Sequence, residues 1–202
     1  MRAPALHAGG HWFKSSIAHH YNELETSVKQ LFYAIRQTPY GWVGALASSQ
    51  GLRRSVMPQP SPQEVMQKLG PESEQAERAE TAFQALFAKL ERFLKGEQVT
   101  FDEAIDPNMG TPFLQQVWRC AREIPYGETR SYAWLARRAG YPGAARAVGQ
   151  AMARNPAPPV VPCHRVIGAD GSLGGYSGGG VEVKRRLLTG EAPGRGKRDP
   201  AG

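Results

Sequence analysis

The chain has 202 residues, of which 41% are hydrophobic and two are cysteines, and its formal net charge is +7. This length allows one large domain or two small ones to bury a core without disulfides or a metal. The N-terminus lacks the apolar stretch of a signal peptide, and no run reaches the ~18 apolar residues that span a bilayer, so we expect a cytoplasmic protein with free thiols and no membrane contact.

The N-terminal half is predicted to contain a small antiparallel sheet. Three apolar stretches are separated by short runs of turn-forming residues, as in strands joined by hairpins. They cover residues 31–36, 42–48 and 52–57.

Helices are predicted to follow this sheet. The run Ser61–Glu64 has the capping-box pattern, with Pro at the first helical position, and predicts a helix that ends near Gly70. From Glu72, apolar residues recur at helical spacing until Gly96, which predicts a second helix.

A domain boundary is predicted in the connecting segment that comes next, near residue 105. It would separate an N-terminal α/β domain with its linker, residues 1–105, from a C-terminal domain, residues 106–202. The charge distribution supports this division. Residues 1–112 carry 11 Lys and Arg against 12 Asp and Glu, whereas residues 113–191 carry 11 against 5. Clustered basic residues attract polyanions such as DNA, although a solvated basic face would have the same composition.

The C-terminal half is predicted to be mainly helical. Thr111 and the proline after it begin one helix, in which Cys120 reads as a packing residue. Ser131 caps a second helix that Gly140 ends, and a third begins at Pro142. Two short, Arg-rich helices joined by a tight turn form a helix-turn-helix pattern, which is typical of DNA-binding proteins but also occurs without DNA.

The helix after Pro142 has few bulky side chains. Arg146 stands among small residues, which either pack closely against another helix or let the backbone approach a narrow DNA groove. The small residues are Ala144, Ala145, Ala147, Gly149, Ala151 and Ala153.

The run "NPAPPVVP", residues 155–162, cannot be helical because its prolines fix φ and remove donors, and we expect an extended ledge that ends at Cys163. His164 and Arg165 follow directly. A neighbouring imidazole and guanidinium can lower a thiol pKa from its usual value of about 8.5 and so produce a nucleophile. We expect His164 to reach the thiol through a water or a turn, because adjacent residues on an extended chain point to opposite faces.

The sequences "NPAPPVVPCHRVIGADGSLGGYSGGG" and "ARAVGQAM" resemble those of the O6-alkylguanine-DNA alkyltransferases, also called methylated-DNA–protein-cysteine methyltransferases. The resemblance is strong over residues 73–191 and looser before them. It implies an α+β protein, with a small N-terminal antiparallel-sheet domain that includes helices and a mainly helical C-terminal domain that contains the helix-turn-helix.

The resemblance also implies catalytic roles for five residues. Cys163 matches the nucleophile that accepts the alkyl group. His164 matches the residue that removes the thiol proton through a bound water. In the family, a carboxylate orients that histidine, an asparagine braces the segment before the cysteine, and a tyrosine turns the flanking phosphate and protonates the departing guanine. These correspond to Glu191, Asn155 and Tyr132.

DNA and pocket residues follow from the same resemblance. Arg146 matches an arginine finger that fills the gap left by the extruded base, and Tyr132, Ala145 and Gly149 are expected beside it at the DNA. A base inside a duplex is beyond the reach of a protein thiol, so base flipping is required. The guanine pocket is expected to be formed by Val166, Tyr176, Ser177, Pro158 and Met152.

The activity implied is DNA repair, in which the alkyl group of O6-alkylguanine in double-stranded DNA, and of O4-methylthymine, passes irreversibly to Cys163 in a single turnover. No cofactor and no metal are expected, and the protein is expected to be a monomer. The spacing from Cys163 to Glu191 is one residue longer than the family pattern. Some family members bind zinc near the N-terminus, but His7, His11, His19 and His20 read as a solvated stretch.

Two other classes of protein compete with this interpretation. A helix-turn-helix binding protein without chemistry explains the charge asymmetry, but leaves the grouping of Asn155, Cys163 and His164 without a purpose. A cysteine hydrolase would need an oxyanion hole, which the sequence does not locate.

Overall fold

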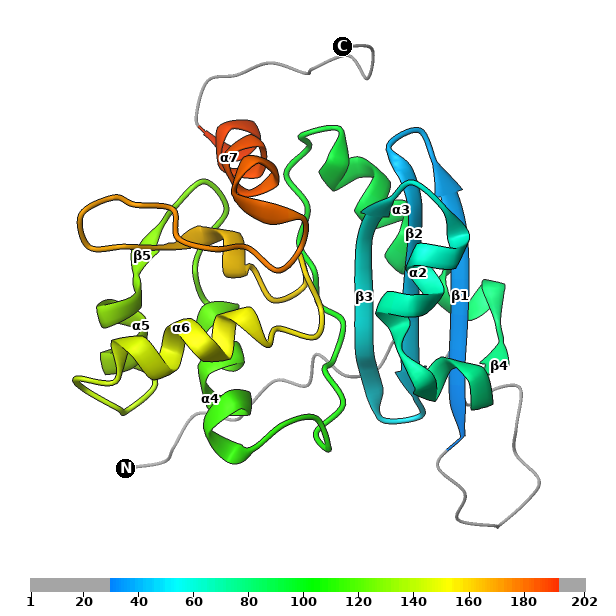
Figure 1. The fold of residues 1–202 in the computed structure, drawn as a ribbon, viewed down its shortest axis with the longest axis horizontal. Helices are drawn as coiled ribbons and strands as arrows, with labels where there is room; N and C mark the ends of the chain where they lie inside the picture. The colour runs from blue at the N-terminus through cyan, green and yellow to red at the C-terminus, as the bar shows by residue number, and fades with distance from the viewer. Residues whose placement is uncertain (1–29, 193–202) are drawn as a thin grey trace, which may run out of the picture.

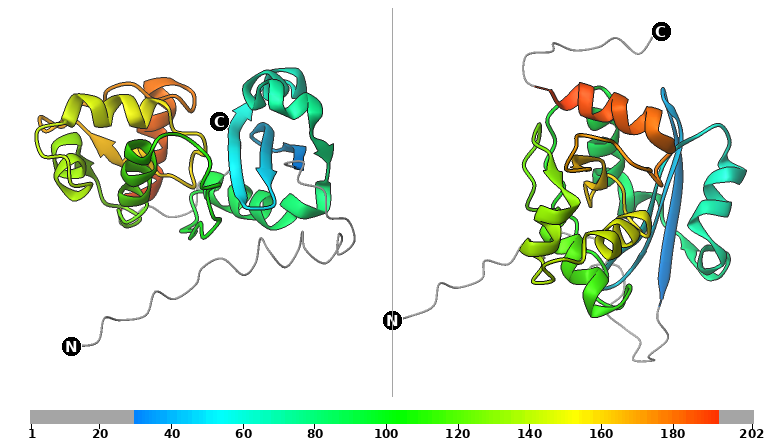
Figure 2. Two further views of the ribbon diagram at one scale, coloured as in Figure 1. Left: turned by 90° about the horizontal axis from the view of Figure 1, so that it is seen from below. Right: turned by 60° about the vertical axis from the view of Figure 1, so that its left-hand side comes forward.

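The computed structural model describes residues 30–192, and Figure 1 shows them as an α+β fold. Among these residues, no helix has both the length and the apolar character needed to cross a membrane. Figure 2 shows two lobes, one built around the sheet and the other around the C-terminal helices.

The three predicted strands are confirmed, as β1 (Leu31–Thr38), β2 (Gly41–Ser48) and β3 (Gly51–Gln59). They pair antiparallel, and the four-stranded sheet has the order β3-β2-β1-β4. The short strand β4 (Glu77–Arg78) was not predicted, and it pairs in parallel with β1. The strand β3 therefore lies at the edge of the sheet that faces the C-terminal lobe in Figure 1.

Both faces of this sheet are covered by helices. The side chains of successive strand residues point to opposite faces, so Leu46 joins the apolar cluster beneath α2 while Ala45 and Ala47 join the cluster beneath α3. The helix α2 (Pro62–Leu69) begins as predicted, with the Ser61 hydroxyl accepting from a backbone N–H of the first turn. It lies so close to β2 that a Cβ added at Gly44 would come within 2.3 Å of a Val65 methyl group.

The helix predicted from Glu72 begins later than expected. A 3₁₀ turn, the strand β4 and a second 3₁₀ turn precede α3, which runs over Gln84–Leu94. The backbone N–H of Ala79 donates to the Tyr33 carbonyl at 2.8 Å, so the sheet edge takes the hydrogen bonds that a helix would have used. The apolar residues at helical spacing still become core, because Phe83, Leu86, Phe87 and Leu90 pack on the sheet.

The C-terminal lobe contains four described helices, α4 (Pro112–Ala121), α5 (Tyr132–Arg138), α6 (Ala145–Ala153) and α7 (Gly180–Glu191). A two-stranded parallel sheet of β5 (Arg130–Ser131) and β6 (Val166–Ile167) accompanies them.

Two of these helices start where the sequence predicts. The hydroxyls of Thr111 and Ser131 cap α4 and α5. The helix α6 begins three residues after the predicted Pro142, because Gly143 adopts a positive φ of 85° and completes a turn first. The pair of helices α5 and α6 has the expected short connection, and its use as a DNA-binding helix-turn-helix stays a prediction.

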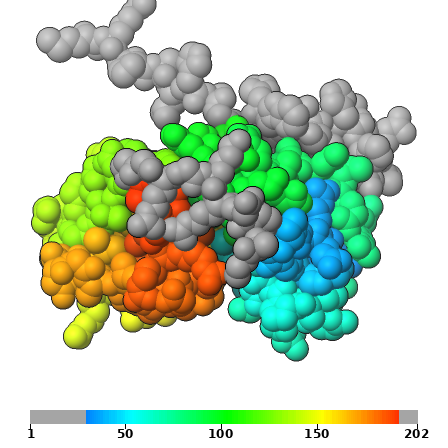
Figure 3. Space-filling model, turned by 90° about the horizontal axis from the view of Figure 1, so that it is seen from above, coloured from blue at the N-terminus to red at the C-terminus, as the bar shows by residue number. Residues whose placement is uncertain are grey.

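The two lobes are held together along the edge of β3. Leu52 pairs with Ile105 of the linker, and the Asp106 carboxylate accepts from Ser48 and Arg53. Figure 3 shows the lobes packed side by side, with the blue and cyan sheet next to the orange and red C-terminal residues. A domain boundary near residue 105 remains a prediction.

Candidate active site

The proline-rich segment before Cys163 is folded into turns, so the expected extended ledge is wrong. The cause is the side chain of Asn155. Its Oδ1 accepts from the Ala157 N–H at 2.9 Å, and its Nδ2 donates to the Val161 carbonyl at 2.8 Å. The Val161 N–H in turn donates to the Ala157 carbonyl. One amide therefore satisfies the backbone groups that the prolines leave without helical partners.

The N-terminal lobe supports this segment directly. The Ser55 N–H donates to the Pro156 carbonyl at 3.0 Å, and the Ser55 hydroxyl donates to the Pro158 carbonyl at 2.7 Å. Ala157 and Val160 pack into the apolar cluster of the sheet. The segment that carries Cys163 is thus built into the N-terminal lobe on one side and leads into the C-terminal lobe on the other.

Cys163 itself is buried, with 4% of its surface exposed. Burial raises the pKa of its thiol to about 11, and only partial compensation comes from the Asn155 hydrogen bond and the charge of Lys184. The expectation that its neighbours would lower this pKa is therefore wrong for the resting structure. The Asn155 amide nitrogen lies 2.9 Å from the sulfur as a donor, so it would stabilise a thiolate once the proton has left.

His164, Glu191 and Arg165 form a buried network beside the thiol. His164 Nε2 lies 2.8 Å from Glu191 Oε1, and Arg165 donates from Nε and Nη2 to the two carboxylate oxygens, each at 2.9 Å. Hydrogen bonds from both partners outweigh burial and lower the Glu191 pKa to about 2. The Arg165 guanidinium therefore donates its hydrogen bonds to Glu191 and to the Ile124 carbonyl, and not to the thiol.

The extra residue between Cys163 and Glu191 does not prevent this contact. The helix α7 begins at Gly180, after a glycine-rich loop, and brings Glu191 to His164 and Arg165.

One ring nitrogen of His164 has no partner. Its Nδ1 is buried without a hydrogen bond among the described residues, and burial lowers the pKa of the imidazole. Because Nε2 is held by Glu191, Nδ1 is the atom that can accept a proton. The hydroxyl of Tyr176 is likewise buried without a partner, and its pKa is raised by burial and by the nearby Cys163. The residue that follows Cys163 thus holds a base without a partner, and Tyr176 holds an unpaired hydroxyl near Cys163.

Lys184 is a site residue that the sequence reasoning missed. It is fully buried, donates from Nζ to the carbonyls of Val166 and Leu173, and lies 5.9 Å from the centre of the Tyr132 ring. Its charge favours the Cys163 thiolate. The signal was its position seven residues before Glu191, which places both on one face of the helix.

The predicted pocket residues come from separate elements. Val166, Met152, Pro158 and Tyr176 are buried, whereas Ser177 is exposed on the loop before α7. The Tyr176 ring lies so close to the loop that a Cβ added at Gly178 would come within 2.6 Å of it. This glycine lets the loop fold tightly over the ring.

The predicted DNA residues lie on or beside α6. Arg146 is exposed, Ala145 and Gly149 are half-buried, and the Tyr132 ring lies 4.0 Å from a Cβ built on Gly149. The other side of the helix packs inward through Val148, Ala151 and Met152. Both readings of the small residues thus have a basis, since Ala151 packs in the core while Ala147 and Ala153 stay exposed.

No group of three or more metal-ligating side chains occurs within residues 30–192. The four N-terminal histidines lie outside the described residues. Cys120 and Cys163 are both free, and Cys120 is buried among core residues as predicted.

Residues 112–193 match a family model described as the DNA-binding domain of 6-O-methylguanine DNA methyltransferase. Methylated-DNA–protein-cysteine methyltransferases from Mycobacterium bovis and Mycobacterium tuberculosis are 52% identical over 107 residues, which is 53% of this chain. The match spans 64% of those relatives' length. A relative of the same name from Methanosarcina acetivorans is 48% identical over 109 residues, covering 54% of this chain and 69% of the relative.

Solved structures agree with these matches over a longer span. The O6-methylguanine methyltransferase of Mycobacterium tuberculosis is 38% identical and superposes with a TM-score of 0.67, covering 82% of this chain and 97% of that one. The structure of the M. tuberculosis protein in complex with DNA gives a TM-score of 0.64 at 38% identity, covering 81% of this chain and 96% of that one. The N-terminal lobe is therefore part of the similarity.

Proposed function

Because the chain belongs to the methylated-DNA–protein-cysteine methyltransferase family, we propose that it repairs DNA by transferring the alkyl group of O6-alkylguanine to Cys163. The observation that carries this proposal is the pairing of a buried sulfur with an Asn155 amide donor and a His164 imidazole held by Glu191. The proposal includes O4-methylthymine as a second substrate, whose methyl group would pass to the same cysteine.

The first step is removal of the thiol proton. A thiol with a pKa of about 11 is protonated at neutral pH and needs a base. The unpaired Nδ1 of His164 accepts this proton through a bound water, while Glu191 holds the ring and stabilises the imidazolium that forms. The Asn155 amide and the Lys184 ammonium stabilise the resulting thiolate.

The second step exchanges one bond for another. The sulfur forms a bond to the alkyl carbon as the bond between that carbon and guanine O6 breaks. Guanine takes a proton as it leaves, and Tyr132 is the donor we assign because it sits beside Cys163 and Lys184. The product is a thioether, which has no carbonyl for water to attack, so each molecule repairs one lesion. No cofactor takes part.

DNA is bound by α5 and α6 in this proposal. Arg146 projects from the exposed side of α6, where small residues allow a close approach to the minor groove. It fills the gap of the flipped nucleotide, and Tyr132, Ala145 and Gly149 adjoin the backbone. The base enters the space bounded by Val166, Tyr176, Ser177, Pro158 and Met152.

We further propose that the protein is a monomer and that it acts in the cytoplasm, because a reducing compartment keeps free thiols such as that of Cys163 from forming disulfides.

Incubation with duplex DNA that carries a radiolabelled O6-methyl group tests the proposal. We expect the label to appear on the protein, and to be lost when Cys163 is replaced by Ser. A duplex labelled at an undamaged position controls for trapped DNA. Label that stays on DNA would indicate a binding protein without chemistry, and label released to solvent would indicate a hydrolase; either result would exclude alkyl transfer.

A further inference from the structure

A cleft of about 440 Å³ lies between the two lobes, along the edge of β3. Apolar side chains from both lobes line it, with Met57 on β3, Met109 in the linker and Trp118 on α4. Volumes of this size and mainly apolar walls are typical of sites for small organic groups. A DNA backbone that only passed over the surface would not need these apolar side chains.

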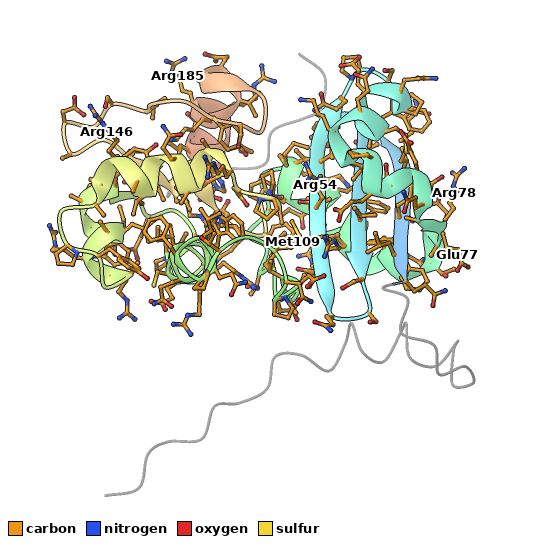
Figure 4. All side chains as sticks on the ribbon, turned by 60° about the horizontal axis from the view of Figure 1, so that its bottom comes forward. Arg54, Glu77, Arg78, Met109, Arg146 and Arg185 are labelled. Atoms are coloured by element: carbon orange, nitrogen blue, oxygen red, sulfur yellow. The ribbon has the colours of Figure 1, made fainter. Side chains whose placement is uncertain are left out.

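The cleft also has cationic lining residues. Arg54, Lys68 and Arg154 line it, and the described lining residues include no carboxylate. Arg54 is half-buried, its Nη1 makes only a 3.3 Å hydrogen bond to the Lys68 carbonyl, and its Nε is buried without a partner. In Figure 4, Arg54 and Met109 lie between the lobes, whereas Arg78 lies at the opposite edge of the sheet. A guanidinium with unused donors can bind an anion.

Asn155 connects the cleft to the sulfur of Cys163. Asn155, which donates to the Cys163 sulfur, is one of its lining residues, and so are Pro158 and Ser177 of the expected guanine pocket. These shared residues are the reason for placing the O6 substituent of a bound guanine in the cleft.

We propose that the cleft receives the O6 substituent of the lesion and favours substituents with an apolar stem and an anionic end, such as a carboxylate. This inference rests on the proposed alkyl transfer. The apolar stem lies on Met57, Met109 and Pro158, and the carboxylate meets Arg54 and Lys68. During transfer the carbon–O6 bond breaks, the carbon–sulfur bond forms, and the substituent remains in the cleft as part of S-alkylated Cys163, while guanine leaves with a proton.

The test uses three substituted free guanines, which avoids any effect of DNA charge. They are O6-benzylguanine, O6-(4-carboxybenzyl)guanine and its neutral partner O6-(4-carbamoylbenzyl)guanine. We expect the carboxylate to react roughly fivefold faster than the carbamoyl compound at low salt, and the ratio to fall as salt screens the charges. Mass spectrometry should place each substituent on Cys163.

Two matched variants assign the effect to the cleft. Arg54→Met keeps an apolar stem and should bring the ratio close to one, whereas Arg78→Met, which removes an exposed arginine paired with Glu80, should leave it unchanged. Rates are divided by the same variant's rate on duplex O6-methylguanine.

Failure of this inference differs from failure of the proposed function. If duplex O6-methylguanine does not react, alkyl transfer itself is wrong. If it reacts but the carboxylate gains nothing, if the gain survives Arg54→Met, or if none of the benzyl compounds reacts, the cleft does not receive anionic substituents.

Discussion

The residues around Cys163 are arranged to keep the thiol unreactive until a base removes its proton. Burial raises the pKa of this thiol, and the charge of Arg165 is committed to Glu191. Asn155 and Lys184 instead favour the thiolate after it forms. The motif Pro-Cys-His-Arg predicted which residue types would meet, but adjacency in sequence gave the wrong partner for the arginine, because a 3₁₀ turn at Cys163–Arg165 redirects the three side chains.

The pH dependence of single-turnover alkyl transfer follows from this arrangement. His164 must be neutral to accept a proton, and burial lowers its pKa below the ordinary histidine value of about 6.5. We expect the rate to be constant between about pH 7 and about pH 9. At lower pH the rate should fall as His164 becomes protonated, and the midpoint of this fall should lie below the ordinary histidine pKa. Rapid-quench rates at constant ionic strength measure it. A rate that rises about tenfold per pH unit across that range would show that a preformed thiolate reacts without the histidine.

Replacing the nucleophile separates chemistry from binding. Cys163→Ser should abolish transfer, yet the affinity for duplex DNA should change by no more than about threefold, because phosphate contacts dominate binding. Fluorescence anisotropy with an O6-methylguanine duplex measures the affinity. A folded variant that no longer binds DNA would contradict the separation.

At the scale of elements, α6 performs two tasks. One side packs in the core through Val148, Ala151 and Met152, and the other exposes Arg146 among small residues. The sequence pattern predicted the helix, and its small side chains could be read directly from the sequence. It placed the start three residues early because the turn at Gly143 resembles a helix beginning with Pro142.

Arg146 should matter only when a base has to be held outside a duplex. Arg146→Ala is expected to slow repair of duplex O6-methylguanine roughly tenfold or more, because restacking the base recovers a few kcal/mol. The reaction with free O6-benzylguanine should keep its rate. Arg185→Ala, which removes an exposed arginine on α7, controls for the loss of charge. Equal losses on both substrates would count against a finger role.

The strand β3 is expected to contribute to catalysis from a distance. Ser55→Ala removes the hydrogen bond to the Pro158 carbonyl and should lower the free energy of unfolding by about 1–2 kcal/mol. It should also slow transfer, since the segment that carries Cys163 loses a support. Ser61→Ala removes a helix cap and should cost about 1 kcal/mol without slowing transfer. Equal rates in the two variants, measured well below both melting temperatures, would show that Ser55 acts on stability alone.

Across the whole molecule, the sequence predicted local structure better than it predicted contacts between the lobes. Strands, capped helices and the identity of Cys163 could be found because periodicity, caps and motifs are local. The pairing of Ser55 with Pro156 and the entry of Ala157 and Val160 into the N-terminal core depend on residues about 100 positions apart in the chain, and no local pattern encodes them. The strand β4 was missed for the same reason, because it forms by pairing with the open edge of β1.

The central claim, that one Cys163 accepts one alkyl group, is tested most directly by counting lesions repaired per protein molecule. Excess duplex O6-methylguanine should give a burst equal to the amount of active protein and no further repair, and mass spectrometry should find a single methyl group on the peptide that contains Cys163. The thioether offers no route back to the free thiol, and Cys120 is itself buried, with its sulfur 3.6 Å from the Arg138 carbonyl. Continued repair after the burst, or a methyl group found only on Cys120, would contradict the account.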